Sequence, residues 1–446
     1  MAKKIKVALI SLGCPRNLVD SEVMLGILKK GGFGVTEDFN NCDAAIINTC
    51  AFIEDAKKES LDLILQVAWL KTENKIRALV VTGCLPQRYH SELKKELKEV
   101  DAFLGTGDFI NIAQTLKDIL AGRPAKKDPG KPVFLYDHTY PRELITPKHS
   151  VYLKLSEGCN NNCSYCIIPS IRGALRSRGI ESLLAEAKAL SGRHRISEIN
   201  LIGQDITLYG TDLKGAPGLS GLIRKLAGLN IAHWIRLLYT HPEHYTDELI
   251  TVVREEPSVC KYLDIPLQHI NDRILKSMNR NTRKVDIMNL IKRLRKEIPG
   301  LALRTTFIVG FPGETDEEFK ELMTFIGETR FERLGVFEYS KEEGTRAYTF
   351  PGHVPEKIKR SRFDAVMKLQ QEVAKEVNRK FLGEDLEVLI DEKADKPYNY
   401  IGRTEYDAPE VDGSCFIRTK ALYRPGDFVR VKITDTLEYD LIGEEQ

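Results

Sequence analysis

Short apolar runs alternate with amphipathic stretches over the first quarter of the chain. Residues 5–11 ("IKVALIS"), 44–50 ("AAIINTC") and 78–84 ("ALVVTGC") are apolar runs of strand length. Between them, apolar residues at four-residue spacing predict helices, the first from about Asn17 to Lys30. Buried strands that alternate with amphipathic helices predict a doubly wound parallel sheet, which we assign to residues 3–121.

The same alternation returns over residues 148–380, after a proline-rich stretch, 122–147, that we interpret as an extended linker. The strand candidates are "VYLKLS", "EINLIG", "WIRLLY", "YLDIPL", "LRTTFIVG" and "LGVFEYS". These six βα units predict a full or partial barrel, whose chemistry lies at the carboxyl ends of its strands. In residues 381–446, short strands between turns such as "VDGS" and "RPGD" predict a small antiparallel β-barrel. The predicted fold class is therefore α/β and multidomain.

Composition changes this picture mainly through the cysteines. With 446 residues, 42% of them hydrophobic, the chain is long enough for about three domains with sizeable cores. No run approaches the roughly 18–20 apolar residues of a membrane span. The apolar run near the N-terminus is short for a signal peptide and is better explained as a strand. Nine cysteines without a secretion signal indicate free thiols, metal ligands or catalytic thiols in a reducing cytoplasm.

Three cysteines, Cys14, Cys50 and Cys84, follow the three strands predicted in the first domain. Ligands of open α/β sheets bind beyond the carboxyl ends of the strands, so we expect these thiols to converge on one edge. The alternative is that they are small buried hydrophobic residues, as free cysteines often are. Three cysteines at the same structural position favour a shared ligand.

A second group, Cys159, Cys163 and Cys166, has the spacing C-x3-C-x2-C just beyond the first barrel strand. A structural zinc site needs four ligands, and only folding would recruit a fourth, such as His194 or Cys260. A 4Fe–4S cluster normally takes four thiolates, so three would leave one iron open for a substrate or cofactor. The open cluster is favoured, and zinc remains an alternative.

The stretch "CNNNCSYC" resembles the radical S-adenosylmethionine signature, in which an aromatic residue, here Tyr165, precedes the last cysteine. The resemblance implies a 4Fe–4S cluster on these cysteines, with S-adenosylmethionine on its open iron. It also implies the family's partial (βα)6 barrel as the fold of residues 148–380. "FIVGFPGET" is similar to the family's glycine-rich strand end near the nucleoside, which implies close backbone approach at Gly310 and Gly313. "LIGQD" is similar to the segment at the methionine end, where Gln204 and Asp205 would accept from the ammonium group. A loop hydrogen-bonded to itself is the alternative.

The whole architecture resembles the methylthiotransferases of this superfamily, with residues 381–446 as a TRAM-like domain. The resemblance implies a second 4Fe–4S cluster, also with an open iron, on the cysteines that end the first three strands. It implies that S-adenosylmethionine supplies both a methyl group and a radical, and that an electron donor and a sulfur donor take part. Arg304 is expected to meet the carboxylate of S-adenosylmethionine, unless it forms an ordinary salt bridge. No further catalytic residue is assigned, and we expect a cytoplasmic monomer without a membrane partner.

Two branches of this family compete. The MiaB-like branch modifies an adenosine in tRNA, and the RimO branch modifies the β-carbon of an aspartate in ribosomal protein S-twelve of the small subunit. "SLGCPRNLVDSE", "YSKEEGT" and "SEGCNNNCSYCIIPSIRG" each resemble the RimO forms. The resemblance therefore implies an aspartate methylthiotransferase, with the tRNA enzyme and a zinc-stabilised ribosome-binding module as alternatives.

Charge favours the same branch. Residues 381–446 carry 8 Lys and Arg against 16 Asp and Glu, a net charge of −8, and the rest of the chain carries +10. An acidic module would repel RNA and would suit a strongly basic partner, such as a ribosomal protein. The alternative is that these acidic residues form a solvated surface.

Overall fold

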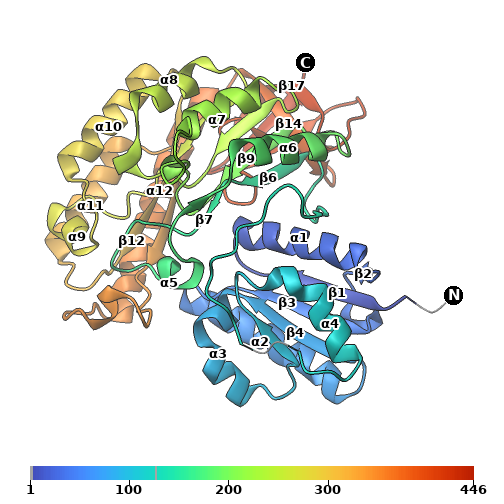
Figure 1. Cartoon of the computed structure of the whole chain (residues 1–446). Coiled ribbons are helices and arrows are strands. Elements are labelled where there is room, and N and C mark those ends of the chain that lie inside the picture. The colour runs from blue at the N-terminus through green and yellow to red at the C-terminus, as the bar shows by residue number, and fades with distance from the viewer. Residues whose placement is uncertain (1–3, 126–127) are drawn as a thin grey trace.

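The chain folds into three successive parts, and the computed structural model describes residues 4–125 and 128–446. The N-terminal part, at the bottom of Figure 1, is a doubly wound sheet. Its elements are β1 (Lys6–Ser11), α1 (Pro15–Lys30), β2 (Gly34–Thr36), β3 (Ala44–Thr49), α2 (Glu54–Thr72), β4 (Ala78–Gly83), α3 (Cys84–Glu96), β5 (Ala102–Leu104) and α4 (Ile112–Leu120). The strands lie in the order β2-β1-β3-β4-β5, with every pair parallel. Helices α1 and α4 pack on one face and α2 and α3 on the other, which confirms the predicted fold.

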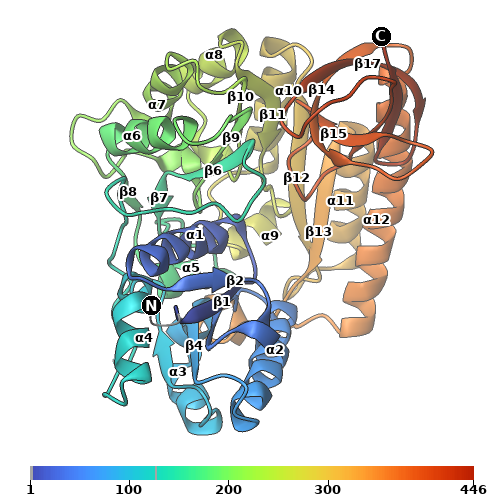
Figure 2. The same cartoon turned by 90° about the vertical axis from the view of Figure 1, so that its right-hand side faces the viewer.

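The middle part is an open barrel of parallel strands surrounded by helices (Figures 1 and 2). Its strands are β6 (Ser150–Lys154), β9 (Glu198–Ile202), β10 (Trp234–Leu237), β11 (Val259–Asp264), β12 (Ala302–Val309) and β13 (Arg333–Glu338). Its helices are α5 (Ile168–Arg172), α6 (Ile180–Ser191), α7 (Gly218–Ala227), α8 (Asp247–Glu255), α9 (Asp272–Ser277), α10 (Lys284–Glu297), α11 (Asp316–Thr329) and α12 (Glu356–Asn378). The strand order β13-β12-β11-β10-β9-β6 leaves β13 and β6 as edges, so the barrel is partial, as predicted. None of the helices in the described ranges is long and apolar enough to cross a membrane.

The C-terminal part is a small closed barrel, at the top right of Figure 2. Its strands are β14 (Asp385–Lys393), β15 (Tyr400–Thr404), β16 (Cys415–Arg418), β17 (Phe428–Thr436) and β18 (Leu441–Glu445). They close in the order β14-β15-β16-β18-β17, and β16 pairs with β18 in parallel. The other four pairs are antiparallel, which confirms the predicted small antiparallel β-barrel, and a closed ring of five strands requires at least one parallel pair.

Acidic side chains of the closed barrel pair with basic side chains of the open barrel. Asp407 lies 2.5 Å from Arg333, and Asp412 lies 3.3 Å from Arg304. Further pairs across this boundary are His149–Asp391, Arg195–Asp427 and His233–Glu387. The negative charge of residues 381–446 is therefore partly matched within the molecule.

The proline-rich linker is packed at the junction between the N-terminal sheet and the open barrel. Its Arg142 is buried, and the guanidinium lies 2.6 Å from Glu22 of α1 and 2.7 Å from Glu186 of α6. Where the linker passes α1, the backbone of Pro141 lies against Gly26. The described part of residues 122–147 contains no helix or strand, yet these contacts hold it in one place.

Helix α1 forms the N-terminal side of that junction, between its own sheet and the open barrel in both views (Figures 1 and 2). Its Asp20 is buried and pairs with Lys154 of β6 and with Arg172 at the end of α5. Glu157 completes this cluster, because it pairs with the same two cations. Buried charges persist only when they are paired, so these residues fix α1 against the open barrel.

Candidate functional site: two cysteine trios

The first trio (Cys14, Cys50 and Cys84) lies at the carboxyl edge of the N-terminal sheet. Cys14 precedes α1, Cys50 directly follows β3, and Cys84 opens α3 directly after β4. Strands β1, β3 and β4 are neighbours in the sheet, so the three thiols come together although they are far apart in sequence. The backbone next to Cys14 approaches Cys50 closely, because a Cβ added at Gly13 would lie 2.7 Å from the Cβ of Cys50.

Two guanidinium groups, from Arg16 and Arg172, face the first trio. Burial raises the pKa of the Cys14 thiol, but Arg16 and Arg172 lower it by more, to about 7. At Cys84 burial dominates and raises the pKa to about 12, although Arg172 points a nitrogen at its sulfur from 3.9 Å. Burial also raises the pKa of Cys50. Nearby cations stabilise the thiolate, which is the form that binds metals, so within this trio Cys14 is the thiol best prepared to bind one.

The second trio (Cys159, Cys163 and Cys166) lies in the loop after β7 (Ser156–Glu157), which pairs with β8 (Arg176–Ser177). Gly158, with φ at +74°, makes the loop possible, because a Cβ there would lie 2.1 Å from a backbone carbonyl oxygen near β8. Arg280 approaches from the turn after α9, with Nη1 4.0 Å from the sulfur of Cys163. All three cysteines are partly accessible.

The spacing of the thiols disfavours a single zinc ion at either trio. Sulfurs around one tetrahedral zinc, each about 2.3 Å from the metal, would be roughly 3.8 Å apart. In the described ranges, the one group of three metal-binding side chains with donor atoms all within 4.8 Å of one another is Asp205, His241 and His244. Neither trio is drawn together that tightly, which fits a larger cluster better than one ion.

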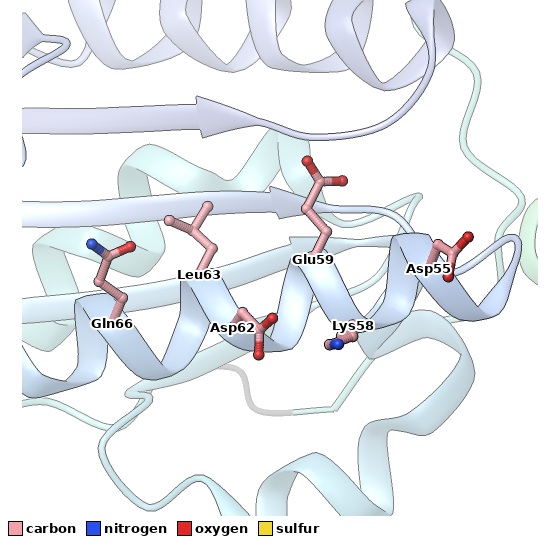
Figure 3. Close-up of a pocket in the computed structure, with 6 residues that line it drawn as sticks. All are labelled: Asp55, Lys58, Glu59, Asp62, Leu63 and Gln66. Atoms are coloured by element: carbon pink, nitrogen blue, oxygen red, sulfur yellow. The ribbon is translucent and has the colours of Figure 1, made fainter.

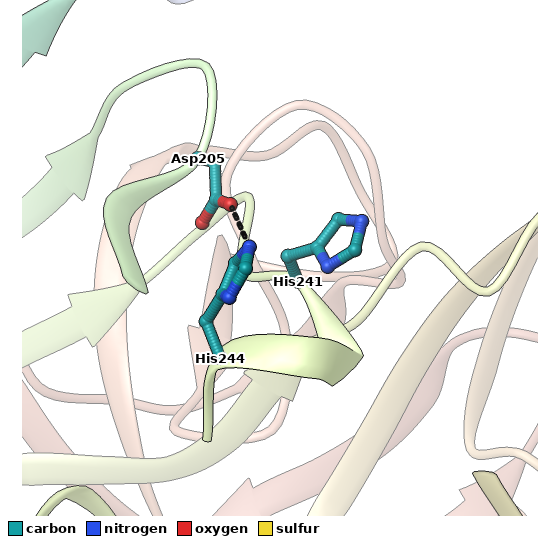
Figure 4. A group of neighbouring side chains, drawn as sticks. All are labelled: Asp205, His241 and His244. Carbon is teal, nitrogen blue, oxygen red and sulfur yellow. Dashed lines mark ion pairs between the residues drawn. The ribbon is translucent and has the colours of Figure 1, made fainter. Parts of the chain in front are cut away.

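Three side chains lie close together beside the second trio, those of Asp205, His241 and His244 (Figure 4). Asp205 accepts at 2.7 Å from the side-chain amide of Asn161, which lies between Cys159 and Cys163. His244 Nε2 lies 3.1 Å from the oxygen of the same amide and 3.7 Å from Asp205. Asp205 and His244 therefore hold the cysteine loop in place. Asp205 also caps its own turn by accepting from the N–H of Thr207, as in the alternative of a loop hydrogen-bonded to itself.

His241 and Gln204 are among the polar side chains at this mouth that have buried atoms without partners in the described structure. Burial lowers the pKa of His241 to about 2, so its ring is neutral at neutral pH. His241 Nδ1 accepts from the backbone N–H of Glu243, but Nε2 has no hydrogen-bond partner in the described structure. Gln204 has a buried side-chain oxygen and a buried side-chain nitrogen without partners there as well. Such atoms usually face a bound group or water.

The other residues predicted to contact the cofactor differ in whether their polar groups already have partners. The hydroxyl of Tyr165 lies 3.4 Å from Arg280. Gly310 and Gly313 both have positive φ, 72° and 79°. Arg304 is occupied, because its guanidinium lies 3.0 Å from Asp264 as well as near Asp412 of the closed barrel. Binding a cofactor carboxylate at Arg304 would require one of these pairs to open.

A hollow along α2 contains none of the predicted site residues (Figure 3). It is lined by Asp55, Lys58, Glu59, Asp62, Leu63 and Gln66. The chemistry-bearing side chains instead gather at the carboxyl ends of the two parallel sheets.

Sequence reasoning missed Arg16, Arg172, Arg280 and His241. No spacing rule connects Arg172 or Arg280 to a cysteine, because each reaches its thiol only through the fold. Arg16 stands two residues after Cys14, so a search for cations beside each cysteine would have found it.

Relatives with assigned names match this chain over nearly its whole length. Ribosomal protein uS12 methylthiotransferase RimO of Geotalea uraniireducens is 51% identical over 99% of this chain and 98% of its own. The protein of the same name from Pelotomaculum thermopropionicum is 47% identical over 99% of both chains. This chain belongs to the RimO family. RimO of Clostridioides difficile is 46% identical, again over 99% of this chain and 98% of its own.

Family profiles divide this RimO-family chain as the fold does. Residues 6–105 match the uncharacterized protein family UPF0004, residues 153–326 the radical SAM superfamily, and residues 382–445 the TRAM domain. Among solved structures, the radical S-adenosylmethionine methyltransferase TsrM of Kitasatospora setae aligns with a TM-score of 0.56 and 15% identity, over 86% of this chain and 79% of its own. The cobalamin-dependent radical enzyme OxsB aligns with a TM-score of 0.52 and 13% identity, over 82% of this chain and 56% of its own. At this identity the two structures support the fold alone.

The mouth of the open barrel fits the cofactor that a radical SAM domain implies. Ser156, Gln204 and His241 each carry a buried polar atom without a partner in the described structure. They follow β6, β9 and β10, adjacent strands, and so lie on one rim beside the second trio. S-adenosylmethionine presents amino, carboxylate, hydroxyl and ring-nitrogen groups, which are the partners that such atoms need.

Proposed function

We propose that this chain methylthiolates the β-carbon of an aspartate in ribosomal protein uS12 (S-twelve). The observation that carries the proposal is its 51% identity, over 99% of its length, to a protein named for that activity. The RimO-like motifs around both trios support the same assignment. The implied setting is the cytoplasm, with an electron donor and a sulfur donor as further partners and a monomeric enzyme.

In this proposal each trio holds one 4Fe–4S cluster. Cys159, Cys163 and Cys166 hold the cluster that binds S-adenosylmethionine, and Cys14, Cys50 and Cys84 hold the auxiliary one. When bound, the first cluster and S-adenosylmethionine supply a radical and a methyl group, and the second cluster supplies a site for sulfur. The contribution of the chain is to fix two thiolate trios in separate sheets and to lock those sheets together through α1.

The polar rim orients the cofactor in this proposal. Gln204 supplies an acceptor for the ammonium group. The neutral ring of His241 supplies a donor through Nε2, because its Nδ1 already accepts from the N–H of Glu243. Gly310 and Gly313 allow the backbone to approach the nucleoside, and Tyr165 lies beside the second trio with Arg280. Asp205 acts on the loop of the second trio rather than directly on the cofactor, because its oxygens already accept from Asn161 and Thr207.

Cysteine variants test the two cluster sites separately. Anaerobically reconstituted protein should contain about eight irons per chain. Cys163→Ala should form no 5′-deoxyadenosine and lose about four irons. Cys50→Ala should lose a similar amount of iron and still cleave some S-adenosylmethionine, but give no methylthiolated product. Normal product from Cys50→Ala, or a colourless protein that binds only zinc, would contradict these assignments.

The substrate is tested by intact-mass measurement of uS12 from cells with and without the enzyme. The proposal expects the methylthio mass increment only when the enzyme is present. An unchanged uS12 together with loss of a methylthio group from tRNA would assign the chain to the alternative, tRNA adenosine methylthiolation.

A further inference from the structure

Arg16 lies at the contact between the N-terminal sheet and the open barrel, beside both cysteine trios. It follows Cys14 by two residues, and its charge acts on the thiols of both Cys14 and Cys166. Its Nη1 donates to the carbonyl oxygen of Gly203 at 2.5 Å, directly before Gln204 on the cofactor rim. The guanidinium carbon lies 4.3 Å from the ring centroid of Tyr239, at the end of β10. Arg16 therefore connects the first trio to the mouth of the open barrel.

The guanidinium of Arg16 has no carboxylate partner in the described part of the chain. The other cation at this junction, Arg172, is paired with both Asp20 and Glu157. Arg142 is likewise paired with two carboxylates. A guanidinium carries five donor N–H groups arranged to meet a carboxylate at two points. Arg16 is thus a sheltered cation, held in place by the Gly203 carbonyl, the Tyr239 ring and a contact with the Cys14 sulfur. Its remaining N–H groups can still meet an anion.

Tyr239 supports Arg16 from a strained backbone position. Its φ is 63°, a left-handed value that a tyrosine rarely adopts and that often marks a functional position. The conformation is locked, because its N–H donates to Asp264 at 3.1 Å and its carbonyl accepts from the N–H of Ile206 at 3.0 Å. This backbone conformation places the Tyr239 ring under the Arg16 guanidinium. The Tyr239 hydroxyl makes no hydrogen bond to the described residues.

We propose that Arg16, supported by Tyr239, binds the side-chain carboxylate of the substrate aspartate at the contact between the two trios. The inference rests on the proposed function, which names an aspartate as the modified residue. The β-carbon of aspartate is bonded directly to the carboxylate carbon, so fixing the carboxylate also fixes the atom that must react. Arg16 makes no bond in the reaction, and its role is positioning and recognition.

Binding of uS12 to the reconstituted holoenzyme tests this role without relying on turnover. The probes are fluorescently labelled uS12 and a variant with asparagine at the modified aspartate, each titrated in the presence of S-adenosylmethionine. A charge-assisted bidentate contact should give the wild-type enzyme at least about a tenfold preference for the aspartate form. Arg16→Met should bind both forms with nearly equal affinity. Tyr239→Leu, which removes the ring under the guanidinium, should reduce the preference, whereas Tyr239→Phe, which keeps the ring, should retain it.

Matched variants separate recognition from damage to the clusters. Arg195→Met removes an exposed arginine that pairs with Asp427 of the closed barrel, and it should keep the full preference. Arg16→Lys keeps a positive charge beside Cys14 without the two-point geometry, so its preference should be intermediate. Iron content is measured for every variant, and if Arg16→Met loads incompletely, Arg16→Lys decides the question.

The inference is overturned if Arg16→Met and Arg16→Lys retain the wild-type preference. It is also overturned if the wild-type enzyme binds both forms of uS12 equally while still methylthiolating the aspartate form. Failure of the wild-type enzyme to modify uS12 at all would instead contradict the proposed function, so the two failures are distinguishable.

Discussion

At the scale of single residues, the junction between the N-terminal sheet and the open barrel depends on close packing of the linker against α1. A Cβ at Gly26 of α1 would lie 2.3 Å from the carbonyl oxygen of Pro141 and 2.5 Å from its carbon. Both atoms belong to the backbone, so a side chain at position 26 could be accommodated only by moving the linker. The linker in turn carries Arg142, whose guanidinium meets Glu22 one turn earlier on α1.

We expect Gly26→Ala to destabilise the protein by about 1–3 kcal/mol, because overpacking forces the linker away from α1. The measurement is the thermal unfolding midpoint, which should fall by a few degrees. Gly327 of α11 is the matched control, since a Cβ there meets nothing within 4 Å. Gly327→Ala should stabilise slightly, by about 0.5–1 kcal/mol, because alanine favours a helix more than glycine does. Equal effects of the two changes would contradict the overpacking argument.

At the scale of elements, helix α1 shows which features could be predicted from the sequence and which could not. The four-residue spacing of its apolar side chains predicts the helix, and the structure confirms it over Pro15–Lys30. The spacing does not predict that Asn17, Asp20 and Glu22 would be buried as well. Their partners lie more than a hundred residues later in the chain, at Arg142 and Arg172.

The same limit applies to the candidate site. The convergence of the first trio was predictable, because strand ends of a parallel sheet share one edge. The position of Arg16 against the mouth of the open barrel was not, since it depends on how two separate sheets dock. Short elements were also missed: β2 and β5 contain three residues each, too few to show a period.

Acid should weaken the docking of α1 against the open barrel. Burial alone would raise the pKa of Glu157, but Arg172 and Lys154 lower it to about 2. Because the folded pKa lies below the ordinary glutamate value, this group stabilises the fold above about pH 4.3, and the contribution is lost as pH falls towards 2. The stability difference between wild type and Glu157→Gln should therefore be large at pH 7 and shrink progressively between about pH 5 and 2.

Thermal midpoints of the two proteins across this range measure the effect. Glu143→Gln is a suitable control, because Glu143 pairs with Lys29 at the surface, where both side chains are more than two-fifths exposed. Surface pairs contribute at most about 1 kcal/mol. A difference for Glu157→Gln that does not change with pH would contradict an ionic role.

At the scale of the whole molecule, the acidic C-terminal barrel is an integral part of the structure. Its net charge of −8 favoured a basic partner on sequence grounds. The structure shows that Asp407 and Asp412 are among the acidic residues that serve to dock the closed barrel on the open one. Charge balance within a segment therefore overstates the charge that the segment offers to a partner.

Removing one of these docking carboxylates should be costly. Asp407→Asn would leave Arg333, which is buried, without its anion, and breaking a buried pair costs about 3–5 kcal/mol. The expected result is a clear fall in the unfolding midpoint and easier proteolysis between the two barrels. Asp435→Asn changes an exposed residue of β17 and should leave both measurements within error. Comparable losses from both variants would indicate a general effect of net charge.

The buried carboxylates of α1 also carry a consequence for biosynthesis. All strands of the N-terminal sheet end by Leu104, so the whole sheet has been translated before the first strand of the open barrel, which begins at Ser150. At that stage Asp20 and Glu22 face water, because Lys154, Arg172 and Arg142 have not yet been made. The nascent sheet therefore presents its thiols together with an acidic, hydrated helix surface, and the later segments cover that surface. The junction at α1 can therefore form only after Arg142, Lys154 and Arg172 have been translated, so docking of the open barrel is a late step that buries charges already present in the finished sheet.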